Sequence, residues 1–511
     1  MSFWTFDTIV RVMGGQWIAK PGTPREPHGA AIDSRAVRAG QVFFALGGER
    51  TDGHRYAANA AASGASLVVI EDPARVPPGD LERIAVTAGI VRVRSCPDAL
   101  LTLGAAVRRA MPGTRVVSIG GSNGKTTTTR LVAAALGKTL RGTHSPKSFN
   151  NALGVPLTLL NARPGDDFVI CEVGTNAPGE IDSLARVVTP DIAVITSLGR
   201  EHLEGLKDLA GVANEECAVL PHVATGGTAI VGIDAPELEA AARAIAARRP
   251  DLTLVTFGVH PSAELRVTDV ACGLDGIRVT VNRRDTFRVP LLGRHNALNV
   301  AAAVGVATRF GLDAVTIAAG LERVVGPEMR LQRQDAGGVL VINDAYNANP
   351  ESMRAAISTF ADILGAEASA PGAFRGRRVA VLGDMLELGP AEADLHAEVG
   401  EAAARTGVFD EIHFVGPRSA HGAEAAERVF GGLAGTSPAA RACRVVRWAD
   451  SSPASCAGIA GELRPGDAVL LKGSRGMGLE GVVAALSRPL SVETASDVSR
   501  GSHAGNTLPR S

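Results

Sequence analysis

The fold is decided by a short glycine-rich stretch, Gly120-Gly121-Ser122-Asn123-Gly124-Lys125-Thr126. It follows a β-branched apolar run typical of a buried strand (115–119) and precedes apolar residues at helical spacing (127–136). Strand, glycine loop and helix in this order form a phosphate-binding loop, because backbone N–H groups and the helix N-terminus point at the anion. Lys125 then reaches the terminal phosphates and the Thr126 hydroxyl holds Mg²⁺. The flanking elements favour a nucleoside triphosphate site over an ordinary glycine turn, although Ile119 replaces the first glycine of the full GxxxxGK[ST] pattern.

Length and composition narrow the class of protein. The 511 residues suggest about three domains. Basic and acidic residues balance (52 against 53), which argues against nucleic acid or a membrane surface as partner. The six cysteines form no CxxC pair, which favours reduced thiols. We expect neither a signal peptide nor a membrane span, and therefore a cytoplasmic protein.

The rhythm of apolar runs predicts an α/β fold in three domains. Residues 1–105 form a small α/β module that includes a helix over Ala57–Ala62 and a strand over Ser66–Ile70. Residues 106–326 alternate strands and helices, as in a doubly wound parallel sheet around the phosphate loop. Residues 327–486 repeat that rhythm in a Rossmann-like domain. The polar, serine-rich segment 487–511 reads as a disordered tail.

Polar residues follow two of the predicted central strands. Glu172 ends the run 168–171, and His202 lies shortly after the run 192–195. Because the carboxyl ends of parallel strands carry the ligand site, both could serve Mg²⁺ beside ATP. For His202 a structural hydrogen bond remains the alternative.

The residues alone do not decide the roles of two other groups of polar residues. Asn296 stands before a predicted helix as a plausible N-cap, and Asn299 is either structural or in contact with the nucleotide. In the first domain, four loop residues are either solvated or ligand-binding: Ser34, Arg35, Asp52 and His54.

Together these motifs resemble the ATP-dependent Mur ligase family. The shared features are the phosphate loop, Glu172, His202, Gly293-x-His295-Asn296-x-x-Asn299 and Asp344. The resemblance is strongest to the type that adds D-alanyl-D-alanine to UDP-N-acetylmuramoyl-tripeptide. The stretches specific to that type are Asp52-Gly53-His54, Asn150-Asn151-x-x-Gly154-x-Pro156-Leu157-Thr158, Gly179-Glu180-Ile181, Asp344-Ala345-Tyr346-Asn347-Ala348-Asn349-Pro350 and Lys472-Gly473-Ser474-Arg475.

The resemblance implies a carbon–nitrogen ligase of peptidoglycan precursor synthesis that converts ATP to ADP and phosphate with Mg²⁺. The tripeptide carboxylate would form an acyl phosphate, which the dipeptide amine then attacks. The chain would act as a monomer in the cytoplasm. The implied catalytic residues are Lys125, Glu172 and His202. The implied ATP-binding residues are Gly121, Ser122, Asn123, Gly124, Lys125, Thr126, Thr127, Asn296, Asn299, Arg330 and Asp344. The implied substrate-binding residues are Ser34, Arg35, Asp52, His54, Asn150, Asn151, Tyr346, Asn347, Lys472 and Arg475. The implied metal ligands are Thr126, Glu172, His202 and Glu216.

One implied ligand departs from the family. Mur ligases usually carry a lysine in the helix after the metal-site histidine, and its carbamylated side chain supplies a carboxylate near Mg²⁺. Glu216 stands at that position here, or Glu215 if the register is off by one, and Lys207 lies more than two helical turns upstream. We expect Glu216 to supply the carboxylate directly. The alternative is a solvated helix charge with the lysine's role lost.

The sequence is also compatible with three other functions. These are an amide ligase of the same superfamily with a different acceptor, a P-loop kinase, and a nucleotide-gated binding protein that releases no phosphate. The sequence leaves open whether the tripeptide ends in diaminopimelate or lysine. Because the implied ATP and dipeptide contacts are split between the second and third domains, we also expect a hinge near 325–327.

Overall fold

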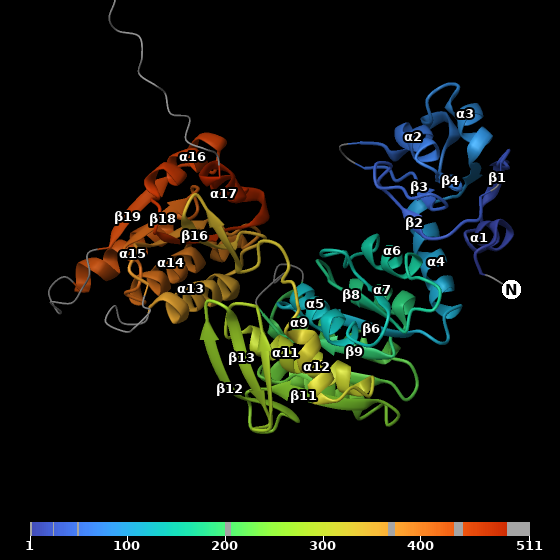
Figure 1. Cartoon of the computed structure of the whole chain (residues 1–511). Coiled ribbons are helices and arrows are strands. Elements are labelled where there is room, and N and C mark those ends of the chain that lie inside the picture. Colours follow the sequence, from blue (N-terminus) through green and yellow to red (C-terminus); the bar gives the residue numbers. More distant parts are fainter. Residues whose placement is uncertain are drawn as a thin grey trace, which may run out of the picture.

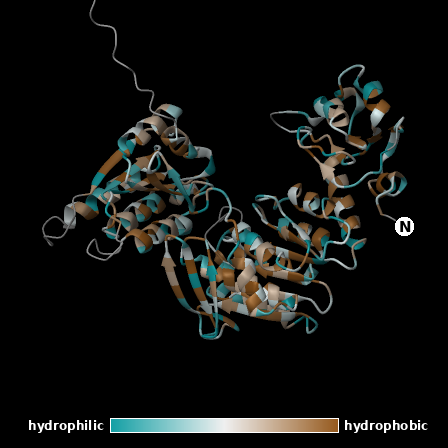
Figure 2. Ribbon diagram, in the orientation of Figure 1, coloured by the Kyte–Doolittle hydropathy of each residue, from teal (hydrophilic) through white to brown (hydrophobic). Residues whose placement is uncertain are grey.

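The computed structural model describes residues 3–23, 25–48, 51–199, 206–365, 374–433 and 443–487. Three β-sheets follow one another along the chain, and each is covered by helices on both faces (Figure 1). The first and third sheets lie on either side of the larger central one (Figure 1). Figure 2 shows hydrophobic residues concentrated on the strands and on the helix faces turned toward them. His202 and residues 488–511 of the predicted tail lie outside the described residues.

The first domain is built on five strands in the order β1-β5-β4-β3-β2, parallel except for β1. Its strands are β1 (Gln16–Ala19), β2 (Ala30–Ala31), β3 (Val42–Phe44), β4 (Leu67–Ile70) and β5 (Gly89–Arg92). Its helices are α1 (Phe6–Val12), α2 (Ala57–Ala62) and α3 (Asp80–Thr87), with 3-10 turns η1 (Gly53–Tyr56) and η2 (Pro73–Arg75). The alanine-rich helix over 57–62 and the strand ending at Ile70 were both predicted, and both are confirmed.

The central sheet has nine strands in the order β14-β13-β12-β11-β10-β9-β6-β8-β7. They are β6 (Arg115–Gly120), β7 (Gly142–His144), β8 (Phe168–Glu172), β9 (Ile192–Ile195), β10 (Thr228–Gly232), β11 (Thr253–Gly258), β12 (Leu265–Gly273), β13 (Gly276–Val281) and β14 (Asp285–Val289). The strands from β7 to β11 are parallel, as predicted. The antiparallel hairpins β12–β13–β14 at the edge were not predicted.

Helices cover both faces of this sheet because its strands alternate apolar side chains between two cores. On β6, Val117 and Ile119 pack toward α5, α11 and α12, whereas Val116 packs toward α6, α7, α9 and α10. These helices are α5 (Lys125–Leu136), α6 (Gly154–Leu160), α7 (Glu180–Val188), α9 (Leu209–Cys217), α10 (Pro236–Ala246), α11 (Asn296–Arg309) and α12 (Ala314–Leu321), with the 3-10 turn η3 (Leu220–His222).

The third sheet has the order β15-β16-β20-β17-β18-β19, parallel except for β15. Its strands are β15 (Gln332–Ala336), β16 (Val339–Asp344), β17 (Arg378–Gly383), β18 (Glu411–Val415), β19 (Arg444–Trp448) and β20 (Ala468–Lys472). Its helices are α13 (Pro350–Leu364), α14 (Glu392–Arg405), α15 (Ala420–Leu433), α16 (Pro453–Glu462) and α17 (Glu480–Leu486), with η4 (Gly389–Ala391) and η5 (Arg475–Met477). The first three cover one face and the last two cover the other.

The first two domains share a joint made of α4 (Cys96–Arg109) and α6. Helix α6 buries Leu157 and Leu160 in the core of the first domain and Val155 and Leu159 in the core of the second. The domain boundary predicted at residue 105 therefore falls inside a helix, α4, that packs against both domains. The boundary predicted at 326 lies in the irregular segment between α12 and β15.

Asn161, at the end of α6, adds a polar clamp to this joint. Its Nδ2 donates to the Ala30 carbonyl (2.9 Å), and its Oδ1 accepts from Gln41 Nε2 (2.8 Å) and the Ala30 N–H (3.3 Å). One side chain thus holds β2 of the first domain against the central domain.

We expect Asn161→Ala to lower the local opening free energy of this joint by about 1–3 kcal/mol, because partly buried donors and acceptors lose their partner. Hydrogen exchange of peptides covering 28–44 and 154–161 measures the change. Asn59→Ala, at an exposed helix position with no side-chain hydrogen bond among the described residues, is the control. Exchange equal to that of the control would contradict the clamp.

Candidate active site

The phosphate loop connects β6 to α5 and is closely packed by its neighbours. Gly121 (φ +111°) and Gly124 (φ +88°) adopt left-handed conformations that favour glycine. A Cβ at Gly121 would collide with Thr196, and one at Gly124 would collide with Asn299. The Thr196 hydroxyl also donates to the Asn123 carbonyl (2.6 Å). Neighbouring elements therefore hold the loop in its curled shape.

Lys125 begins α5 and folds back over this loop. Its Nζ donates to the carbonyls of Gly121 (2.6 Å) and Ser122 (3.1 Å), so the ammonium lies at the mouth of the loop. These bonds are confined to the loop, and a phosphate group can replace them. The position suits a cation that neutralises a terminal phosphate.

Glu172, at the carboxyl end of β8, faces the first turn of α5. Its Oε2 accepts from the Thr126 hydroxyl (2.9 Å) and its Oε1 from Asn150 Nδ2 (3.1 Å), and the residue is 1% exposed. Burial raises the pKa of this carboxyl, while the charge of Lys125 and the Thr126 hydrogen bond oppose the rise.

The Thr126–Glu172 pair suits Mg²⁺, which is usually bound by one or two carboxylates together with substrate phosphates and water. Within the described ranges, no three His, Cys, Asp or Glu side chains gather closely enough to form a metal site of protein ligands alone. Two further metal ligands were predicted: His202 belongs to the segment that is not described, and Glu216 contacts the phosphate loop from α9.

A cavity of about 480 Å³ opens between the central and third domains over the phosphate loop. Most of the predicted ATP and substrate residues meet there. Those lining it are Ser122, Asn123, Gly124, Lys125, Thr126, Thr127, Asn150, Asn151, Glu172, Asn296, Asn299, Arg330, Asp344, Tyr346, Asn347 and Lys472. Gly121, Glu216, Arg475 and the predicted first-domain residues do not line it.

The third domain contacts the phosphate-loop side of this cavity through two polar pairs. The Tyr346 hydroxyl donates to Ser148 Oγ (3.0 Å), and Asn349 Nδ2 donates to Asn123 Oδ1 (3.3 Å). Arg330 stacks over the Tyr346 ring, 4.4 Å from its centroid, and also lines the cavity. The Tyr-Asn-Ala-Asn stretch thus forms the wall opposite the phosphate loop.

Lys472 and Arg475 occupy different surroundings. Lys472 is 1% exposed, and its Nζ pairs with Asp344 Oδ2 (2.7 Å) and donates to the Asn347 carbonyl (2.8 Å). It therefore holds the turn that carries Asn347. Arg475 lies outside the cavity and pairs with Glu480 (2.7 Å).

Asn296 and Asn299 lie on α11 behind the loop. The prediction of Asn296 as N-cap is wrong, since the helix begins at Asn296 and its cap position is His295. Asn296 Nδ2 instead donates back to the Leu292 carbonyl (2.7 Å). Asn299 Nδ2 donates to Asn296 Oδ1 (2.8 Å), and its Oδ1 accepts from Thr128 (3.2 Å). Asn299 thus connects α11 to the phosphate-loop helix, and Asn296 holds the Asn299 side chain in place.

The predicted substrate residues of the first domain differ in their surroundings. His54 is fully buried, with Nδ1 paired to Asp52 (2.7 Å) and Nε2 accepting from the Glu71 N–H (3.0 Å), so both ring nitrogens stabilise the fold. Arg35 is exposed and paired with Asp33 (2.8 Å). Ser34, the residue before Arg35, is buried.

The two candidate glutamates of α9 accept hydrogen bonds from different backbone segments. Glu216 is 1% exposed, and its Oε2 accepts from the Gly121 N–H (2.6 Å) at the entrance to the phosphate loop. Glu215 accepts from the N–H groups of Gly179 (2.8 Å) and Ile181 (3.0 Å) at the start of α7. Of the pair, Glu216 is the one that contacts the phosphate loop.

Several polar residues of the cavity were not among the predicted site residues. They are Ser148, Thr175, Asn176, Thr196, Ser197, His295, Asn349, Glu351, Ser352, Glu387. His295 and Asn349 lie inside motifs recognised in the sequence, and Ser148 stands two residues before Asn150. Thr196 and Ser197 directly follow the predicted strand 192–195, so their position at a strand end could have found them, and the others lie outside the recognised motifs.

Comparison with known proteins agrees with this arrangement. Three regions match family descriptions: "Mur ligase family, catalytic domain" (26–108), "Mur ligase middle domain" (119–307) and "Mur ligase, glutamate ligase domain" (329–475). The UDP-N-acetylmuramoyl-tripeptide–D-alanyl-D-alanine ligase of Bacillus subtilis (strain 168) is 33% identical over 459 residues, which are 89% of this chain and 92% of the relative. The ligase of that name from Escherichia coli (strain K12) is 32% identical over 394 residues, covering 76% and 81%. A crystal structure of MurF from Acinetobacter baumannii has a TM-score of 0.77 at 26% identity, covering 95% and 99%.

We expect Glu216→Gln to raise the Mg²⁺ concentration for half-maximal nucleotide binding about tenfold, because it removes a buried charge but keeps an oxygen for the Gly121 N–H. Calorimetric titration with ATP at a series of Mg²⁺ concentrations measures this. Glu215→Gln makes the same substitution at the glutamate that binds the start of α7, and it should leave the Mg²⁺ dependence unchanged. Parent behaviour in both variants would show that neither glutamate serves the metal.

Proposed function

The chain belongs to the Mur ligase family, and we propose that it joins D-alanyl-D-alanine to UDP-N-acetylmuramoyl-tripeptide while ATP is converted to ADP and phosphate. The observation that carries this proposal is the cavity with the phosphate loop on one wall and the Tyr346–Asn349 stretch on the other. A transferring phosphate and an incoming amine can meet in such a space.

The first half-reaction requires two anions to approach each other. The tripeptide carboxylate attacks the γ-phosphorus, and the bond to the β-phosphate oxygen breaks, giving an acyl phosphate and ADP. Lys125, the loop N–H groups and the start of α5 face the phosphates and offset their charge. Mg²⁺, when bound beside Thr126 and Glu172, supplies further positive charge to the phosphate oxygens.

In the second half-reaction the dipeptide amine attacks the acyl carbon, and phosphate leaves from the tetrahedral intermediate. Positioning and charge neutralisation suffice for both steps, so no side-chain nucleophile is required. Asn347, on the turn fixed by Lys472, and Tyr346 border the space where the acceptor would enter. Asn150 and Asn151 border it from the central domain, where the tripeptide end would lie.

We assign a mobile role to the third domain. Helix α6 and Asn161 join the first two domains, whereas the third meets the phosphate-loop side of the cavity through the Tyr346 and Asn349 pairs. Closure about 325–327 would tighten the cavity around its ligands. Since both walls of the active-site cavity come from one chain, we infer that the protein acts as a monomer. It places the reaction in the cytoplasm, where ATP is available.

We expect Lys125→Ala to reduce phosphate release at least a hundredfold while the fold persists, because its ammonium contacts only loop carbonyls. Phosphate release with ATP, UDP-linked tripeptide and D-alanyl-D-alanine measures this, and omitting any one of the three should abolish release from the parent. Lys138→Ala, on the exposed surface just after α5, is the matched control.

Three outcomes would overturn the assignment. Comparable release by a folded Lys125→Ala variant would remove the phosphate loop from the reaction. ADP formation without the dipeptide at the full rate would favour a kinase. A faster reaction with another amino acid as acceptor would indicate a different ligase of the superfamily.

A further inference from the structure

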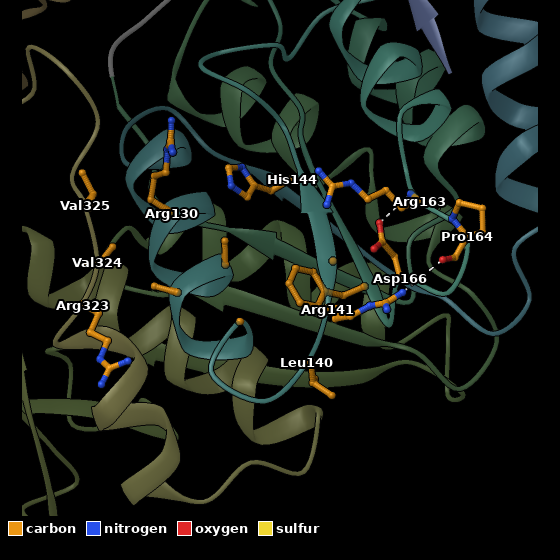
Figure 3. A pocket seen from close by; sticks show the side chains of 15 residues that line it. Arg130, Leu140, Arg141, His144, Arg163, Pro164, Asp166, Arg323, Val324 and Val325 are labelled. Atoms are coloured by element: carbon orange, nitrogen blue, oxygen red, sulfur yellow. Dashed lines mark hydrogen bonds between the residues drawn. The ribbon is translucent and has the colours of Figure 1, made fainter. Parts of the chain in front are cut away.

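A second cavity, of about 700 Å³, lies at the β7 edge of the central sheet and shares no lining residue with the first. Its walls come from α5, β7, the loop before β8 and the segment that follows α12 (Figure 3). Its size falls within the range of small-molecule sites. The reaction proposed above makes no use of it.

This cavity, the basic pocket, is defined by Arg130, Arg141, Arg163, Arg323, His144 and Asp166, which surround it in Figure 3. Four arginines against one aspartate leave a net charge of +3 with His144 neutral (4 − 1 = 3). Such an excess on one concave surface concentrates anions.

Some charged groups of the basic pocket already have hydrogen-bonding partners in the fold, and others have none among the described residues. In the described part of the chain, the guanidinium groups of Arg130, Arg163 and Arg323 have no hydrogen-bonding or ion-pair partner. Asp166, in contrast, is buried and accepts from the Thr143 hydroxyl (2.7 Å) and the Arg163 N–H (2.9 Å). Its carboxylate is therefore occupied by the fold. Arg141 is also engaged, since its Nη2 donates to the Gly165 carbonyl (3.2 Å), and the other three arginines are left to bind an anion.

His144 adds a directional group to the pocket. Its Nδ1 donates to the Ser145 carbonyl (3.1 Å), which leaves Nε2 for a ligand. Burial lowers the pKa of His144, the Ser145 hydrogen bond opposes this, and the charge of Arg130 lowers the pKa further. An anion bound beside the ring would favour its protonated form.

The pocket also has an apolar side and a wall next to the third domain. Ala133, Leu140, Phe168 and Val324 contribute apolar surface. Val324 and the exposed Val325 belong to the irregular segment between α12 and β15 that leads to the third domain. A ligand contacting Arg323 and Arg130 together would connect that segment to the phosphate-loop helix.

We propose that the basic pocket binds a small anion carrying at least two phosphoryl groups, at a site separate from the active site. Guanidinium groups match phosphoryl oxygens with paired N–H donors, and two phosphoryl groups carry enough charge to offset the excess of three. Because one wall leads to the third domain, occupancy of the pocket is coupled to nucleotide binding in the active site.

Inorganic pyrophosphate is the probe, and the ring signal of His144 in NMR spectra of the full chain is the readout. His144→Gln assigns that signal by its loss. We expect pyrophosphate to shift it saturably toward the protonated form at fixed pH, and orthophosphate to bind at least tenfold more weakly. A second arm repeats the titration with a non-hydrolysable ATP analogue and Mg²⁺. Coupling predicts at least a threefold change in pyrophosphate affinity that levels off once the active site is saturated, whereas direct competition in the basic pocket would grow with every further addition of the analogue.

Matched variants locate the binding. Arg130→Ala combined with Arg163→Ala should raise the dissociation constant at least tenfold, and Arg163→Ala alone, at an exposed position, should raise it severalfold. Arg248 is an exposed arginine on the other face of the sheet, and its guanidinium has no partner among the described residues. Arg248→Ala should therefore leave the dissociation constant within twofold. An unmoved His144 signal, or equal affinities in all variants, would overturn the site.

Equal affinities with and without the ATP analogue would overturn the coupling alone. The His144 readout needs no turnover. Failure of the basic pocket is therefore distinguishable from failure of the proposed function.

Discussion

The structure depends on keeping the phosphate loop curled between β6 and α5. Gly121 and Gly124 hold left-handed conformations, and Thr196 and Asn299 occupy the space where their Cβ atoms would stand. Glu216, on a third element, accepts a hydrogen bond from the Gly121 N–H. Residues from α9, α11 and the segment after β9 therefore meet on seven consecutive residues of the chain, and the central domain must be assembled before the loop can bind an anion.

Two joints of different kinds connect the three domains. Helix α6 buries apolar residues in two cores and ends in the Asn161 clamp, so both packing and hydrogen bonds join the first two domains. The third domain contacts the phosphate-loop side of the active-site cavity through exchangeable polar pairs, which closure or ligand binding can remake. The irregular segment between α12 and β15 also borders the basic pocket, which places both proposed ligand sites beside the proposed hinge.

Sequence reasoning recovered most of the architecture because its signals are local. The phosphate loop, the alanine-rich α2 and the buried strands of the second and third sheets follow from apolar runs and glycine positions. The hairpins β12–β14 and strand β15 were missed because the predictions relied on continuous apolar runs. These strands instead alternate buried and exposed residues, as in the buried Ile277 and the exposed Arg278. Motif membership could not reveal that His54 has both ring nitrogens occupied, or that Lys472 is buried against Asp344.

The central claim is that the active-site cavity activates a carboxylate by phosphorylation. The most direct measurement supplies UDP-linked tripeptide whose terminal carboxylate carries isotopically labelled oxygen, with ATP and D-alanyl-D-alanine, and analyses the released phosphate by mass spectrometry. Attack by the carboxylate on the γ-phosphorus predicts one labelled oxygen in each phosphate, since the carbon–oxygen bond breaks when the amine adds. Phosphate without label would contradict the account.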